Sequence, residues 1–159
     1  MPVASRNELT IFLSYLVLHK NMTGETLVPT RGKLERSLAQ GIQALYRSLL
    51  GHQTSQALCN ILDNKLIIVI ENAITKPEKL LAQNGQEGLA SQVRSQLESV
   101  LELPLKDLIK EVLGVAVIDL LRDATFETGR TGTIAILESA PKVRDAISKS
   151  KTPPAAADS

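Results

Sequence analysis

The sequence has little of several residue types on which specific functions depend. Its 159 residues include one cysteine, two histidines and no tryptophan, and only 3% of them are aromatic. A single cysteine excludes an intramolecular disulfide and a cysteine-based zinc site, and two histidines leave few ligands for another metal. The net charge of +1 lacks the basic excess typical of nucleic-acid-binding proteins. We therefore predict no metal and no cofactor, and nucleic acid is an unfavoured partner.

Long hydrophobic runs are also missing, since none approaches the ~20 residues that a membrane-spanning helix needs. The most apolar run, residues 11–18, has three open interpretations: the core of a signal peptide, a strand or helix of the domain, or sequence upstream of a natural start at Met22. Glu8 and the absence of a small-residue cleavage pattern argue against the signal peptide. We assign residues 1–29 to an N-terminal segment of undecided status and predict a cytoplasmic protein that does not span a membrane.

Hydrophobic periodicity predicts one domain over residues 30–139, followed by a disordered tail over 140–159 that is rich in Pro, Ala and Lys. The expected elements are a helix over 30–50, strands over 55–62 and 65–71, two helices between 75 and 113, and strands over 115–121 and 131–138. This α-β-β-α-α-β-β order predicts an α+β fold. We expect a two-layer sandwich, with helices packed on one face of a mainly antiparallel four-stranded sheet.

The strand over 65–71 is apolar on both of its faces. A strand with helices on one side and water on the other usually alternates apolar and polar residues, so a second covering element is indicated. We predict an interaction face made of Leu66, Ile67, Ile68, Val69 and Ile70. The favoured partner is a second copy of the chain, because twofold dimers are the commonest oligomers. The alternative is that the N-terminal apolar segment folds over the strand.

The polar loop expected over residues 122–130 is a second candidate site, because loops at strand ends often carry function. Its candidate residues are Arg122, Asp123, Phe126, Glu127 and Arg130. We interpret them as a contact surface for a protein partner rather than as a catalytic pair. The alternative is a solvated loop with exposed ion pairs that contribute only about 0–1 kcal/mol each.

One pattern favours nucleic acid. The element order up to the third strand is that of a type II KH domain, in which a GxxG loop between two helices clamps phosphates. Here the corresponding loop is formed by Gly85, Gln86, Glu87 and Gly88. Glu87 places a negative charge where a phosphate would lie, and the nearest cations along the chain are Lys79 and Arg94. RNA binding is therefore the second hypothesis, and a turn that joins two helices is the simpler interpretation.

Catalytic patterns are weak. Cys59 is expected on the inward face of a strand, where a thiol is usually a small core residue. His52 has no second ligand at helical spacing, and no phosphate-binding glycine motif follows a strand. We therefore predict a protein without catalytic residues, and an enzyme of unknown reaction is the third hypothesis.

Four segments of the chain resemble the bacterial MpsC-like family. They are Tyr46–Gly51, Glu71–Leu81, the pair Val93-Arg94, and Leu121–Asp123 with the strand Ile134–Glu138. The second segment is similar to the family's LEG-x-LT-x-x-E-x-x-L pattern. One departure is Leu50-Gly51-His52-Gln53, where the family often has Gly-Lys-Gly-Pro. The likeness covers about two-thirds of the chain.

The resemblance implies a small protein linked to a membrane complex that generates membrane potential and takes up inorganic carbon, and it implies no catalytic residues. It also suggests a relation to members involved in cyanobacterial biofilm formation. Together with the residues, it leads us to predict a non-catalytic regulatory or accessory protein. We expect a homodimer that contacts another protein, for which a membrane-associated one is the candidate, in ion or carbon uptake or in biofilm formation.

Overall fold

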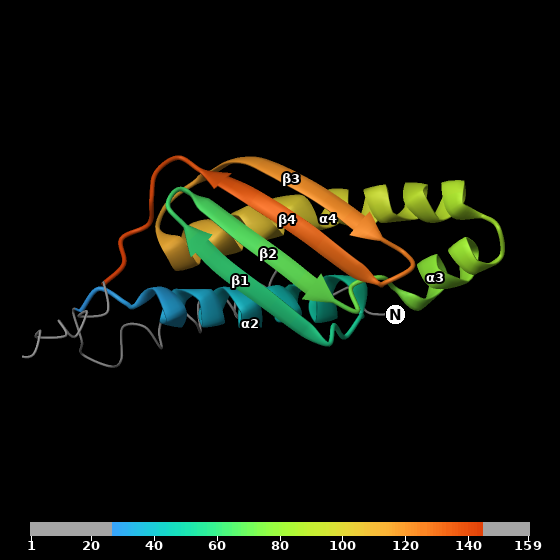
Figure 1. Cartoon of the computed structure of the whole chain (residues 1–159), viewed down its shortest axis with the longest axis horizontal. Coiled ribbons are helices and arrows are strands. Elements are labelled where there is room, and N and C mark those ends of the chain that lie inside the picture. Colours follow the sequence, from blue (N-terminus) through green and yellow to red (C-terminus); the bar gives the residue numbers. More distant parts are fainter. Residues whose placement is uncertain (1–26, 145–159) are drawn as a thin grey trace, which may run out of the picture.

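A computed structural model describes residues 27–144 (Figure 1). Its elements are α2 (Arg31–Leu50), β1 (Gln56–Leu62), β2 (Lys65–Glu71), α3 (Lys76–Gln83), α4 (Glu87–Leu113), β3 (Val117–Thr125) and β4 (Arg130–Leu137). The predicted order and the α+β class are confirmed. The predictions for residues 11–18, Met22 and 145–159 lie outside the described residues.

The four strands form one antiparallel sheet in the order β1-β2-β4-β3. Helices α2 and α4 pack against each other on one face of this sheet, and we call them the helix layer. Helix α3 lies at the end of the sheet, beside the turn that joins β3 to β4 (Figure 1). No described helix covers the opposite face of the sheet, so the fold has two layers.

Helix α2 has clear sequence reasons for its bounds. The Oγ1 atom of Thr30 accepts a hydrogen bond from the backbone N–H of Lys33 at 3.3 Å, which caps the first turn. Gly51 ends the helix with a left-handed φ of 59°, and its N–H donates to the Arg47 carbonyl oxygen. Between these caps, one stripe faces the core: Leu34, Leu38, Ile42, Leu45 and Tyr46.

Helix α4 continues through Pro104, where the sequence predicts a break or a bend. Proline has no N–H, so the carbonyl oxygen of Val100 loses its helical partner. Val100 is half-exposed, and water can bond this oxygen. Leu101 before the proline and Leu108 after it are both buried in the same core. Packing on both sides of Pro104 therefore keeps the helix in one piece.

Two predicted boundaries need correction. Strand β3 extends to Thr125, so Arg122 and Asp123 lie on a strand and the loop shrinks to residues 126–129. The polar residues that suggested a loop alternate along the edge of the sheet instead. Residues 140–144 belong to the described structure: Pro141 is buried, and the Arg144 N–H donates to the Pro29 carbonyl oxygen at 2.9 Å.

The contact between α2 and α4 depends on Gly41. A Cβ atom at this position would lie 2.7 Å from Cδ1 of the buried Leu108. We expect Gly41→Ala to lower the free energy of unfolding by about 1–3 kcal/mol, because overpacking outweighs the gain in helix propensity. Gly32→Ala is the matched control on the same helix, since no atom lies within 4 Å of its Cβ position. Urea unfolding should show a stabilised control, and equal stabilisation of both variants would contradict this packing.

Candidate functional site

The two faces of β2 have different surroundings, and this divides the predicted interaction face. Leu66, Ile68 and Ile70 are buried against the helix layer and belong to the core. Ile67 and Val69 point to the other side, where Ile67 is 37% exposed. Only these two of the five predicted residues can contact a partner on the uncovered side.

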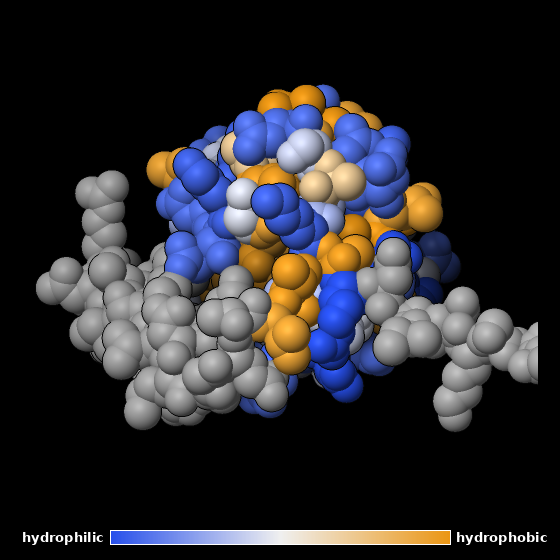
Figure 2. Space-filling model, turned by 90° about the vertical axis from the view of Figure 1, so that its left-hand side faces the viewer, coloured by the Kyte–Doolittle hydropathy of each residue, from blue (hydrophilic) through white to orange (hydrophobic). Residues whose placement is uncertain are grey.

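We call this uncovered side the outer sheet face. Its strand residues follow from the pairing register: Asn60, Ile67, Ile134 and Leu121 form one row across the four strands. Seven hydrophobic side chains of the outer sheet face come from all four strands: Leu58, Leu62, Ile67, Val69, Leu121, Ile134 and Ile136. Figure 2 views the end of the molecule where β1 turns into β2, and shows hydrophobic surface there between hydrophilic side chains.

Charged side chains lie around this apolar area. Lys65 and Asp119 lie in the row at one end, and Asp123 lies beside Gly132 on the edge strand β3. At the other end, Arg130 Nε donates to both carboxylate oxygens of Glu71 at 2.8 Å. The outer sheet face thus has an apolar centre and a rim of mixed charge, which is the usual arrangement of a protein–protein contact surface.

The predicted contact loop is split between three places. Arg122 turns inward, where its Nη1 donates to the Glu98 carbonyl oxygen at 2.9 Å and its Nη2 pairs with Glu102 at 2.7 Å. Asp123 and Arg130 lie on the outer sheet face. Phe126 and Glu127 remain at the turn. The five residues therefore do not act as one loop.

The turn between β3 and β4 lies beside the GxxG loop, a proximity that the residue spacing did not predict. Phe126 and Glu127 line an open groove of about 730 Å³ together with Glu87 and with Lys79 of α3. The Nζ atom of Lys79 donates to Asn72 Oδ1 at 2.9 Å. The groove thus presents two carboxylates beside a cation that already has a partner, which is a poor environment for phosphate.

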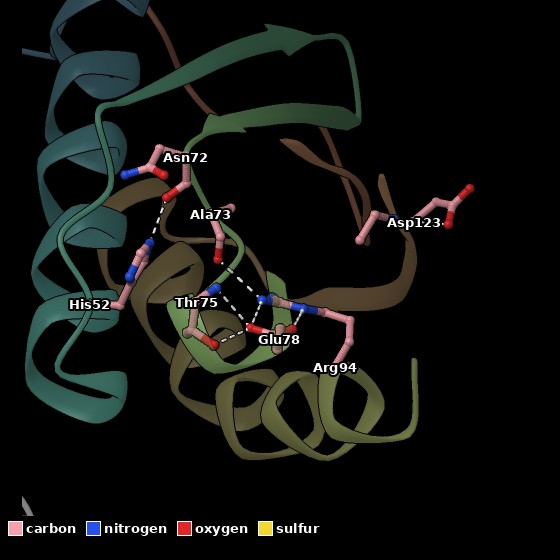
Figure 3. Close-up of polar contacts among 8 residues, drawn as sticks. His52, Asn72, Ala73, Thr75, Glu78, Arg94 and Asp123 are labelled. Carbon is pink, nitrogen blue, oxygen red and sulfur yellow. Dashed lines mark hydrogen bonds and ion pairs between the residues drawn. The ribbon is translucent and has the colours of Figure 1, made fainter. Parts of the chain in front are cut away.

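A buried ion pair lies between α3 and α4 (Figure 3). Arg94 Nε donates to Glu78 Oε1 at 2.6 Å, and Arg94 Nη2 donates to Glu78 Oε2 at 2.7 Å and to the Ala73 carbonyl oxygen. Glu78 Oε2 also accepts from the N–H and the hydroxyl of Thr75, which completes the capping box of α3. Both charged side chains are almost completely removed from water.

Lys79 and Arg94 are the cations nearest to the GxxG loop along the chain. Because Arg94 is paired with Glu78, it cannot bind a phosphate at that loop. Arg94 points into the protein, and Figure 3 shows it within the cluster while Asp123 lies apart. Its Nη1 atom is buried and has no hydrogen-bond partner among the described residues. Burial also raises the pKa of the Tyr46 phenol, and hydrogen bonding with Thr131 and the positive charge of Arg94 offset part of that rise.

A cavity of about 30 Å³ lies between the helix layer and β4, with Tyr46, Glu98, Arg122 and Thr131 in its lining. That is roughly the volume of one water molecule in the liquid. The cavity is too small for an organic ligand. These polar side chains consequently serve the packing of α4 on the sheet.

Sequence reasoning missed the Glu78–Arg94 pair, although one signal was present. Arg94 lies four residues after Ala90 and seven before Leu101, both buried on one face of α4. A charge within an apolar stripe demands an opposite charge, because an unpaired buried charge is very costly. The partner sixteen residues away could not be chosen from spacing alone.

The candidate nucleophile is buried. Cys59 is 4% exposed, and burial, with a smaller effect of Glu35, raises its pKa from 9.0 to about 12. His52 makes a 2.6 Å hydrogen bond between Nε2 and the Asn72 carbonyl oxygen. Within residues 27–144 no three His, Cys, Asp or Glu side chains gather into a possible metal site. None of the described helices is long and apolar enough to cross a bilayer.

These observations define a small α+β protein. Glu78 and Arg94, two residues of the segments quoted from the sequence, hold α3 against α4. The family model described as "Na+-translocating membrane potential-generating system (MpsC)" matches residues 30–139. The chain therefore belongs to the MpsC family, as the resemblance predicted. Comparisons with curated proteins and with solved structures give no match.

The Glu78–Arg94 pair leads to a prediction about stability. Arg94→Met should cost about 3–5 kcal/mol of unfolding free energy, because it leaves the Glu78 carboxylate buried without its counter-charge. Combining it with Glu78→Gln should recover part of the loss, since no buried charge remains. The control is Lys106→Met, which breaks the more exposed pair with Glu102 and should cost less than about 1 kcal/mol. Similar losses for Arg94→Met and Lys106→Met in urea unfolding would refute this assignment.

Burial of Cys59 predicts a pH dependence. The folded-state pKa lies above the unfolded value, so its contribution to stability is complete below pH 9.0 and declines as the pH rises toward about 12. Cys59→Ala should lack this decline in alkaline unfolding curves. At neutral pH, a thiol reagent should label the wild-type protein only after unfolding, and rapid labelling of the folded chain would contradict the burial.

Proposed function

We propose that this protein is a non-catalytic accessory protein of a bacterial membrane-potential-generating system, and that it works by binding protein through its outer sheet face. The observation that carries the proposal is the apolar centre of that face, which no described element covers. Exposed apolar patches rimmed by polar residues are typical of protein contact surfaces.

The chemistry of the described residues supports a role without catalysis. The buried side chains of Glu78 and Arg94 form an ion pair with each other, and Arg94 also donates to the Ala73 carbonyl oxygen. Cys59 is protonated at physiological pH, because burial raises its pKa to about 12. An active site usually combines an accessible cleft with titratable groups of shifted pKa. The groove at the β3–β4 turn is lined by the carboxylates of Glu87 and Glu127 beside Lys79, whose ammonium already donates to Asn72.

The physiological setting of the proposal comes from the family. Its description names a membrane-potential-generating system, and we place this chain at the cytoplasmic side of such a system. Uptake of ions or inorganic carbon, or control of biofilm formation, would then depend on the contact. The proposed partners are two. A second copy of the chain forms the homodimer, and a membrane-associated protein joins it in the larger assembly.

A complementation experiment tests this function. The gene is deleted in its host, and the cells are supplied with the wild-type chain, with Ile67→Lys plus Ile134→Lys, or with Leu103→Lys. The first variant places two charges in the centre of the outer sheet face, and the second places one on the exposed surface of α4. We expect the membrane potential, read with a voltage-sensitive dye, to recover with the wild type and the α4 variant only.

All three chains must be produced at equal levels and unfold at similar urea concentrations, so that a failure reports contact rather than folding. Full recovery with the Ile67→Lys plus Ile134→Lys chain would overturn the role of the outer sheet face. A membrane potential that does not change on deletion would overturn the accessory function itself.

A further inference from the structure

We infer that a second copy of this chain occupies the outer sheet face, so that two sheets pack face to face around a twofold axis. This inference rests on the proposed function, because it names the first partner of the same surface. Three observations favour it: the bonded donors at the edges of the sheet, the charges of the face, and the fit of its central residues. The area of the face limits the strength of the contact.

Several backbone donors at the two edges of the sheet already have a hydrogen-bond partner. On edge strand β1, the outward N–H of Ile61 donates to Glu35 Oε1 at 2.8 Å. On edge strand β3, the N–H groups of Leu120 and Ala124 donate at 2.8 Å to the carboxylates of the residues before them. Backbone donors that are already bonded cannot pair with another strand, and natural proteins protect their edges in such ways. Addition of a strand from a second copy would have to break these hydrogen bonds. We therefore favour association through the outer sheet face over a sheet that continues from one copy into the next.

The charges of the face complement themselves. Lys65 and Glu71 lie at opposite ends of β2 and both belong to the outer sheet face. A twofold axis that crosses the strands midway between Ile67 and Val69 brings Lys65 of one copy over Glu71 of the other, and the reverse. Because both oxygens of Glu71 already accept from Arg130 of the same chain, Lys65 of the other copy would join an existing pair, and it would do so twice by symmetry. The rim as a whole mixes both signs, so like copies do not repel.

On β2 and β4 the same axis fits large residues against small ones, whereas on the edge strand β3 it brings Leu121 over Asp123. It places Ile67 opposite Val69 of the second copy at the centre of β2. On β4 it places Ile134 opposite Gly132, which has no side chain to collide with it. Aligned sheets in β-sandwiches pack in this manner, with apolar side chains interdigitating between them.

The area predicts a weak and reversible dimer. The face spans four strands and, along β2, residues Lys65 to Glu71. At ~4.8 Å between strands and ~3.4 Å per residue this is a flat area of about 400 Å² per copy. The total of about 800 Å², increased somewhat by the relief of the side chains, falls below the ~1,200 Å² of stable complexes. We therefore expect a concentration-dependent equilibrium between monomer and dimer.

Sedimentation velocity of the full chain over a wide range of concentration tests the inference. The wild type and Leu103→Lys should shift from monomer to dimer with the same dissociation constant. Ile67→Lys should raise that constant at least about tenfold, which corresponds to 1.4 kcal/mol. A monomer at every concentration, or a dimer that Ile67→Lys leaves intact, would overturn the inference.

Cross-linking tests the axis independently of affinity. Chains carrying Ile67→Cys are mixed with chains carrying Val69→Cys under mild oxidation, and a covalent dimer of the two is expected. The native Cys59 is buried and does not compete. Chains carrying Leu103→Cys replace the Ile67→Cys chains in the control, and no covalent dimer with the Val69→Cys chains should form. Equal yields in both mixtures would contradict the geometry.

One further variant excludes the competing occupant within the same chain. If residues 11–18 covered the face, Phe12→Asp plus Leu16→Asp would turn a monomeric wild type into a dimer, and this result would refute the inference.

Complementation separates the two proposals. If the wild type is monomeric and Ile67→Lys plus Ile134→Lys still fails to restore the membrane potential, the face binds another protein, so only the dimer is wrong. If the dimer is observed and those chains restore the potential, only the proposed function is wrong.

Discussion

The buried ion pair between Glu78 and Arg94 is the contact on which the arrangement of the helices depends. It joins the first turn of α3, the backbone at Ala73 and the middle of α4 at one point. Because removing either charge would strand the other inside the protein, this pair tolerates little displacement of α4. With α4 fixed beside α2 on one side of the sheet, the outer sheet face remains the uncovered side of the described fold.

The segments that resemble the MpsC family contribute both to the interior and to the outer sheet face. The segments that relate the chain to the MpsC family include Tyr46, Glu78, Arg94 and Arg122. All four turn inward, where they pair, cap a helix or line a small cavity beside α4. Other residues of the same segments, Leu121, Ile134 and Ile136, lie on the outer sheet face, which has an apolar centre and a charged rim. The segments thus include residues that hold the fold together and residues that are exposed on this face.

The periodicity of the sequence predicted the element order and the helix over residues 30–50, because local spacing and turn chemistry decide them. It also found that β2 is apolar on both sides, which is the basis of the outer sheet face. It could not resolve which contacts close the tertiary structure. Of the break or bend predicted at Pro104, the break does not occur, because packing on both sides outweighs one lost hydrogen bond. Arg122 was misplaced because its partners, Glu98 and Glu102, lie on another element.

The central claim is that the working surface of this protein is the outer sheet face, and methyl NMR spectra of the full chain at increasing concentration test it most directly. The account predicts that the methyl signals of Ile67, Val69 and Ile134 move with concentration, while those of the core residues Ile42 and Ile68 stay in place. Signals that move on α4, at Val100 or Leu103, while the outer sheet face stays unchanged would contradict it.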